Sequence, residues 1–187
     1  MEDDMKYQKE FLCQTALFNA IGAAFQRAAI YRDDVDNKAK DKLKRDLEDH
    51  LRRLESQYHD TVTSEEHSLN IDLLARDISR RHAQVLKDGR FRVGVAQKAL
   101  NIYLKLIWCY GWIPEPPHCP LDSIVLMASG DTQTKWTKMC DIEAYRAAIE
   151  AIRDHINQEA PGKSLSQWEL EVWNNRRKGS VQLPSAN

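Results

Sequence analysis

An all-α fold is predicted for this chain of 187 residues. Apolar residues recur at the spacing of one helical face in most segments, and no segment alternates with the period of two that is typical of a strand. Capping residues, glycines and prolines divide the chain into six or seven helices. With 42% hydrophobic residues, the chain can bury a sizeable core. We therefore predict one helical domain over residues 1–178, formed by two lobes with a cleft between them, and a frayed tail over residues 179–187.

The first three helices are predicted between residues 5 and 85. Phenylalanines at the spacing of one helical face predict that a helix over residues 5–31 buries their rings in the core. These are Phe11, Phe18 and Phe25. Leucines among charged residues predict an amphipathic surface helix over residues 38–58. Thr63 and Glu66 have the spacing of a capping box, which predicts the start of a third helix.

A polar stripe marks the fourth predicted helix, at about residues 93–108. This helix is apolar or glycine around most of its girth. Its polar residues fall within an arc of roughly 100° and are Gln97, Lys98, Asn101 and Lys105. Such a pattern is typical of a central helix whose polar edge faces either bulk water or a cleft. Because Asp88-Gly89 ends the preceding helix, residues 74–110 are predicted to form a helix, a tight turn and a second helix.

The second half of the chain is predicted to be helical after a rigid loop. Four prolines stiffen residues 111–121 and exclude regular structure there. Asp122 then stands at the N-cap position of a short apolar helix. Asp141 is placed to cap an amphipathic helix, and Ser166 with Glu169 repeats the spacing of a capping box at the start of a last helix.

Charge and composition narrow the function classes. The formal net charge of −1 excludes a strongly basic global field. Residues 76–92 nevertheless hold six basic and two acidic side chains, a surplus that can contact phosphates or simply form a solvated helix face. The N-terminal segment lacks the features of a signal peptide, and no apolar run is long enough for a bilayer. We therefore expect a cytoplasmic protein with no membrane partner.

The four cysteines predict neither a disulfide framework nor a metal centre. They show no CxxC pairing in a chain without an export signal, so reduced thiols are expected. One zinc site can be considered, and its ligands would be Cys109, His118, Cys119 and Cys140. Adjacent histidine and cysteine are a poor ligand spacing. We therefore predict no metal and no cofactor.

Lys98 and Asp122 are the candidate catalytic residues. Lys98 follows Gly94-Val95-Ala96, a turn at a helix N-terminus whose backbone N–H groups favour an anion such as a DNA phosphate. A lysine held against apolar walls loses proton affinity and can attack a sugar carbon. Asp122 could stabilise a developing cation or accept a proton. In the alternative interpretation, Lys98 extends to solvent and Asp122 only caps a helix.

Two segments resemble the helix-hairpin-helix DNA glycosylase superfamily. Residues 94–104, GVAQKALNIYL, are similar to its hairpin and following helix, which run GVGRKTANVVL. Residues 118–125, HCPLDSIV, are similar to its VPVDTHV segment. The resemblance implies an all-α, two-lobed fold that flips a damaged or modified base out of DNA and cleaves its N-glycosidic bond. It implies Lys98 as the nucleophile, able to form a Schiff base and to act as a lyase, and Asp122 as the activating carboxylate.

The same resemblance implies where DNA would bind. The expected DNA-binding residues lie in and just before the hairpin: Arg90, Arg92, Gly94, Val95, Ala96 and Gln97. Base flipping also requires an aromatic or apolar pocket. Three residues near the candidate site in sequence are expected to line it: Trp112, His118 and Trp136. Each of the three could instead be a core or loop anchor. The expected partner is DNA that contains a damaged or modified base.

Two other function classes remain open. Arg76 and His82, with five residues between them, resemble the Arg-x4–6-His motif of the helical HEPN ribonucleases, and Arg53 with His59 repeats that spacing. The third class is a non-catalytic helical adaptor, in which the polar stripe simply faces water.

Overall fold

The computed structural model describes residues 2–177, in which the fold is all-α, as predicted. The frayed tail predicted for residues 179–187 lies outside the described residues. Within them there is no strand, and a lone antiparallel bridge joins Tyr31 to Leu86. The α-helices are α1 (Glu2–Phe25), α2 (Asn37–Glu55), α3 (Ser64–His82), α4 (Val93–Cys109), α5 (Ser123–Ala128), α6 (Ile142–Glu159) and α7 (Leu165–Arg177). Short 3₁₀ turns lie at Ser56–His59, Lys87–Gly89 and Trp136–Lys138.

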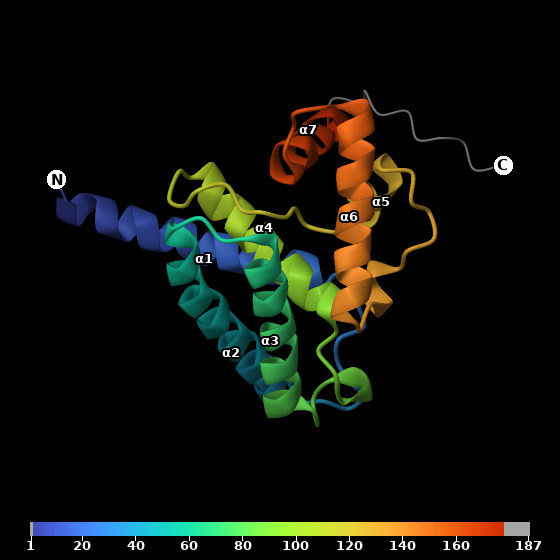
Figure 1. The fold of residues 1–187 in the computed structure, drawn as a ribbon. Helices are drawn as coiled ribbons and strands as arrows, with labels where there is room; N and C mark the ends of the chain where they lie inside the picture. Colours follow the sequence, from blue (N-terminus) through green and yellow to red (C-terminus); the bar gives the residue numbers. More distant parts are fainter. Residues whose placement is uncertain (1, 178–187) are drawn as a thin grey trace.

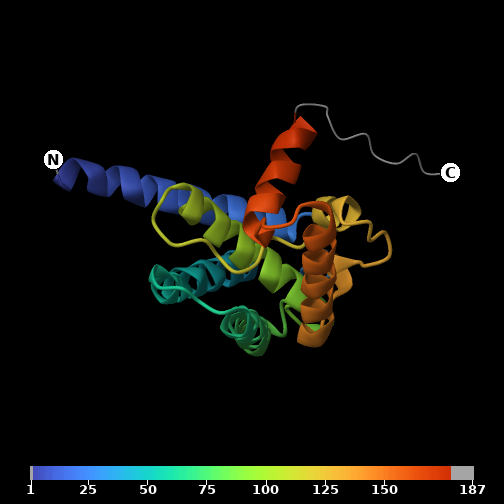
Figure 2. The ribbon, with the colours of Figure 1, turned by 45° about the horizontal axis from the view of Figure 1, so that its top comes forward.

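The central element is α4, which lies between α1–α3 and α6 (Figure 1). It contacts α1, α2 and α3, and it also contacts α6 and the turn Trp136–Lys138. The last helix, α7, contacts both α5 and α6. These three helices of the second half of the chain therefore lie together. One continuous hydrophobic core includes residues from all seven α-helices. The N-terminal half of α1 extends beyond the other helices in both views (Figures 1 and 2).

Local capping residues explain where most of the helices begin. The capping box of Thr63 and Glu66 is present at α3, and Asp122 and Asp141 accept N-terminal N–H groups of α5 and α6. These three predictions are confirmed. The prediction for the last helix is wrong by two residues, because Ser164 rather than Ser166 accepts the N–H group of Gln167.

The prediction that the phenylalanines of α1 belong to the core is wrong for Phe11 and Phe18, whereas Phe25 packs against the edge of the core. Phe11 and Phe18 are 70% and 77% exposed, and Phe25 is only partly buried. The buried face of α1 carries smaller residues: Cys13, Ala16, Leu17, Ala20, Ile21 and Ala24. These residues allow close approach to α4, and the Sγ atom of Cys13 lies 3.4 Å from Oη of Tyr103. The rings of Phe11 and Phe18 therefore point away from the core.

No described helix, within residues 2–177, combines the length and apolar content needed to cross a membrane.

Candidate functional site

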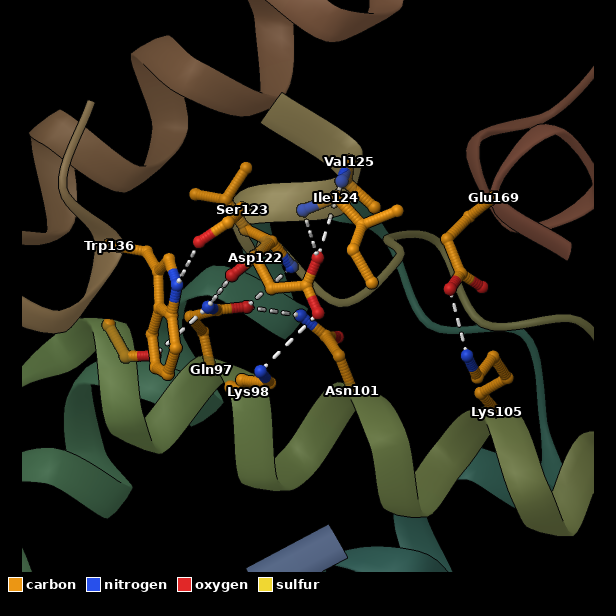
Figure 3. A network of polar contacts seen from close by, with 12 residues as sticks. Gln97, Lys98, Asn101, Lys105, Asp122, Ser123, Ile124, Val125, Trp136 and Glu169 are labelled. Atoms are coloured by element: carbon orange, nitrogen blue, oxygen red, sulfur yellow. Dashed lines mark hydrogen bonds and ion pairs between the residues drawn. The ribbon is translucent and has the colours of Figure 1, made fainter. Parts of the chain in front are cut away.

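The polar stripe of α4 is buried by the second half of the chain. Gln97 and Asn101 are fully buried, and Lys98 is 8% exposed. Lys105, at the end of the stripe, is partly buried and lies 2.8 Å from Glu169 of α7. Figure 3 shows these side chains on the side of α4 that faces α5 and the loop before it. The stripe therefore packs against protein, which excludes bulk water, one of the two alternatives that the sequence left open.

Lys98 and Asp122 meet at the centre of this buried surface. Lys98 Nζ lies 3.3 Å from Asp122 Oδ2. The other carboxylate oxygen, Oδ1, accepts the N–H groups of Ile124 and Val125 at 2.9 and 3.2 Å. Asp122 therefore caps α5 and pairs with Lys98 at the same time, as Figure 3 shows. The helix cap considered for this carboxylate is present, and its other oxygen contacts Lys98.

Trp136 covers the lysine. Its ring centroid lies 4.2 Å from Lys98 Nζ, within the range of a cation–π interaction. The indole N–H donates to Ser123 Oγ at 3.3 Å, so the ring is tied to the first turn of α5. Of the three expected pocket residues, Trp136 is the one that contacts the Lys98–Asp122 pair.

Gln97 attaches the proline-rich loop to α4 directly before Asp122. Its amide nitrogen donates to the carbonyl oxygen of Leu121 at 2.6 Å, and its amide oxygen accepts the N–H of Leu121 at 3.0 Å. The amide nitrogen also donates to the carbonyl oxygen of Gly94 at 2.9 Å. Gln97 was expected to contact DNA, but in the structure it positions the residue next to the candidate carboxylate.

Burial makes the Lys98 amine easier to deprotonate. Loss of solvent lowers the pKa of Lys98, and this effect exceeds the opposing attraction of the Asp122 carboxylate. The positive charges of Arg27 and Lys105 lower the same pKa further. The result is a desolvated amine beside a carboxylate, a combination that can supply a nucleophile and a proton acceptor.

A buried hydrogen-bond network continues from Asn101. Its amide nitrogen donates to Gln97 Oε1 and Tyr145 Oη, both at 3.1 Å. Its amide oxygen lies 2.8 Å from His67 Nε2. Tyr145 Oη is also 2.9 Å from Nδ1 of His118. Sequence reasoning missed this network, although a polar amide inside an otherwise apolar helix is a signal that buried partners exist.

His118 belongs to this network and does not line an open pocket. It is 1% exposed, and its Nε2 atom lies 2.6 Å from Ser64 Oγ. Burial lowers its pKa to about 2, with help from His67 and Arg153. Trp112 is partly buried, with its ring against Tyr110 and Lys9. His118 was expected to line the base pocket, and in the structure it is buried inside this network.

The N-terminus of α4 is occupied by protein. The N–H group of Gly94 donates to the carbonyl oxygen of Met139 at 2.9 Å. The N–H groups of Val95 and Ala96 both donate to the backbone carbonyl oxygen of Arg92. All three residues are buried. In this structure the turn therefore offers no free N–H group at these positions, contrary to the expectation of an open phosphate site.

The two expected arginines differ in their surroundings. Arg90 is exposed, whereas the guanidinium of Arg92 donates to the carbonyl oxygens of Ala28 and Ala29. Both line a surface groove of about 420 Å³ that Arg76 also lines, with Asp72 and Asp141 as its acidic side chains. The Lys98–Asp122 pair does not line this groove.

The arginine–histidine pairs of the ribonuclease hypothesis do not form a shared site. Arg76 pairs with Asp72 on the exposed face of α3. His82 is buried and lies 2.9 Å from Asp46. A separation of six positions places the two side chains about 120° apart around the helix. Arg53 and His59 are both exposed, and lie on α2 and on the following turn.

The cysteines are free thiols in the part of the chain that the structure describes. Cys13 and Cys119 are buried, and Cys109 and Cys140 are exposed. Burial raises the pKa of Cys119. Residues 2–177 contain no group of three or more histidine, cysteine or acidic side chains placed to hold a metal ion.

Comparisons of the chain with protein-family models, curated proteins and solved structures found no match.

Proposed function

We propose that the chain is a DNA glycosylase that uses Lys98 and Asp122 to remove a damaged or modified base. The supporting observation is the 3.3 Å contact between Lys98 Nζ and Asp122 Oδ2, two groups from the separate segments that carry the family resemblance. The order of α3, the turn Lys87–Gly89 and α4 fits a helix-hairpin-helix element. An aspartate at the N-terminus of a short helix then completes the pattern.

In the proposed reaction, the neutral Lys98 amine attacks C1′ of the flipped nucleotide. The nitrogen lone pair forms the new N–C1′ bond, and the electrons of the glycosidic bond leave with the base, which takes up a proton. Asp122 accepts a proton from the alkylated amine and stabilises positive charge at the sugar. The nitrogen lone pair then forms a C=N bond at C1′ while the C1′–O4′ bond breaks, and O4′ takes the proton held by Asp122. The resulting Schiff base is reduced by borohydride to a stable adduct.

Access to Lys98 requires movement of the segment between α5 and α6. The Trp136 ring covers the amine, and the side chains of Lys98 and Asp122, taken without their backbone atoms, are 10% and 17% exposed. In the proposed cycle the Trp136–Lys138 turn swings away from α4, which opens the predicted cleft and uncovers the N-terminus of α4. The extruded base then takes the place of the Trp136 ring, and the Arg90 side of the hairpin contacts phosphates.

Borohydride trapping tests the proposal. The full chain is incubated with a panel of duplexes that each contain one modified base, and released bases are identified by mass spectrometry. We expect a covalent adduct with at least one duplex and its loss in Lys98→Gln. Lys105→Gln is the matched control, since it removes the other buried ion pair of α4 and leaves Lys98 in place. Absence of both adduct and base release over the whole panel would refute the function.

A further inference from the structure

The outer face of α1 carries an uncovered aromatic stripe. Tyr7, Phe11 and Phe18 are 79%, 70% and 77% exposed. At about 100° per residue these three positions and Gly22 fall within an arc of about 60°, opposite the buried face of Cys13 and its neighbours. Exposed aromatic residues gathered on one face of a helix mark an interaction surface.

The stripe is complementary to itself in one antiparallel register. When two copies of α1 run in opposite directions with Phe11 opposite Phe18 of the second copy, Tyr7 falls opposite Gly22. Gly22 has open space around it, because a Cβ built there meets no atom within 4 Å. The space beside the glycine can therefore receive the Tyr7 ring. At the middle of the stripe the same register places Gln14 opposite Thr15, two uncharged residues.

We propose that this face binds a second copy of the chain, as an antiparallel pair of α1 helices around a two-fold axis. A two-fold interface uses the same patch on both copies, and this stripe supplies both the aromatic side chains and the gap that receives one. Charge favours the same arrangement. The sequence is acidic at positions 2–4, and the exposed Arg27 lies two residues beyond the other end of α1, so an antiparallel pair brings the acidic end of one copy toward Arg27 of the other.

The area of the stripe is small for a protein interface. Three aromatic rings at these exposures offer about 400 Å² on each copy, about half of the 800 Å² per partner of a standard stable interface. The pair should therefore be weak and dissociate at low protein concentration. The stripe lies opposite the face of α1 that packs on α4, so the proposed dimer does not use the face that carries the Lys98–Asp122 pair.

Opposite charges introduced at the two facing positions, 11 and 18, test the proposed register. Sedimentation velocity of the full chain is measured between about 1 and 300 μM. We expect a monomer–dimer equilibrium that Phe11→Glu and Phe18→Lys each weaken about tenfold or more. The double variant Phe11→Glu/Phe18→Lys should recover dimerisation, because each glutamate then faces a lysine of the other copy. A parallel arrangement would place like charges together, so failure of the double variant to recover overturns the proposed register.

Gly22→Leu tests the gap without endangering the fold. The new side chain occupies open space in the monomer and improves helix propensity, but it blocks Tyr7 of the second copy. We expect weaker dimerisation with an unchanged or higher Tm at low concentration. Leu69→Glu on α3 is the matched control, since Leu69 is also exposed, and it should leave the equilibrium unchanged. A chain that stays monomeric at 300 μM, or a dimer indifferent to Phe18→Lys, refutes the proposal.

Discussion

Gly94 and Trp136 pack backbone against backbone, since a Cβ at position 94 would lie 1.8 Å from the carbonyl oxygen of Trp136 and 3.2 Å from Cβ of Met139. This contact seats the Trp136–Lys138 turn on the first turn of α4. The closeness of the turn places the Trp136 ring over Lys98. A glycine outside the candidate catalytic pair thus determines how that pair is covered.

Gly94→Ala should destabilise the protein. The added methyl group must displace the turn, which also breaks the hydrogen bond from Gly94 N–H to Met139. We expect the free energy of unfolding to fall by about 2–3 kcal/mol, measured by urea denaturation. Gly22→Ala is the control, because its Cβ meets no atom, and it should raise stability by about 0.5–1 kcal/mol. Equal stability of Gly94→Ala and the parent chain would contradict the close packing.

Asp122→Asn should cost more stability at pH 7 than at high pH. Burial already lowers the pKa of Lys98, and loss of the carboxylate lowers it further. At pH 7 the unpaired ammonium then costs about 2–4 kcal/mol. The unfolded chain releases the same proton near its ordinary pKa of 10.5, so the penalty disappears as the pH rises toward that value. Urea denaturation at pH 7 and pH 10 measures the difference.

A second variant separates the ion pair from the cap in this prediction. Lys98→Met/Asp122→Asn removes both charges and keeps an N-cap residue, so it should be more stable at pH 7 than Asp122→Asn alone. If the double variant is the less stable of the two, the penalty comes from the cap of α5 and not from the unpaired lysine.

Stability should fall steeply as the pH drops below 6.5. Burial lowers the pKa of His67 to about 4 and that of His118 to about 2. The unfolded chain therefore binds two protons below pH 6.5 that the folded chain does not bind, and acid favours unfolding. At pH 5 the loss is about 2 kcal/mol for each histidine. Chemical denaturation from pH 7.5 to pH 5 measures this loss. In His67→Gln the free energy of unfolding should fall less steeply as the pH is lowered.

Leu17 and Phe18 are neighbours in sequence with opposite burial. Leu17→Ala should cost about 2–5 kcal/mol, because Leu17 is fully buried and the change leaves a cavity. Phe18→Ala should change the stability of the monomer by less than about 1 kcal/mol. Thermal denaturation at low protein concentration compares them. If Phe18→Ala lowers the stability of the monomer by more than this, the Phe18 ring is buried in the monomer and the exposed position described above is contradicted.

Helix boundaries could be predicted because their causes are local. The capping box of Thr63 and Glu66 and the cap by Asp122 each involve residues two or three positions apart. The face that α1 buries could not be predicted in this way. Its heptad of phenylalanines and its stripe of small residues are both periodic, and only the surface of α4 determines which of the two is covered.

The candidate site shows the same division between local and distant causes. Lys98 and Asp122 were linked through a resemblance, and they lie in contact. The partners of Gln97 and Asn101 could not be inferred, because Leu121, His67 and Tyr145 lie 24 to 44 positions away. Only the fold brings these groups together.

The hydrogen bonds of Asn101 determine where the protons of two histidines lie. Because the amide oxygen faces Nε2 of His67, that nitrogen must carry the hydrogen, and Nδ1 then accepts from Tyr58. Tyr145 accepts from Asn101 and therefore donates to Nδ1 of His118, which leaves the hydrogen on Nε2 there too. If the Asn101 amide were rotated by half a turn, its NH₂ group would face the N–H of His67 Nε2, and two donors would meet without an acceptor. Both rings are consequently held in a single tautomer, which nitrogen NMR shifts would report directly.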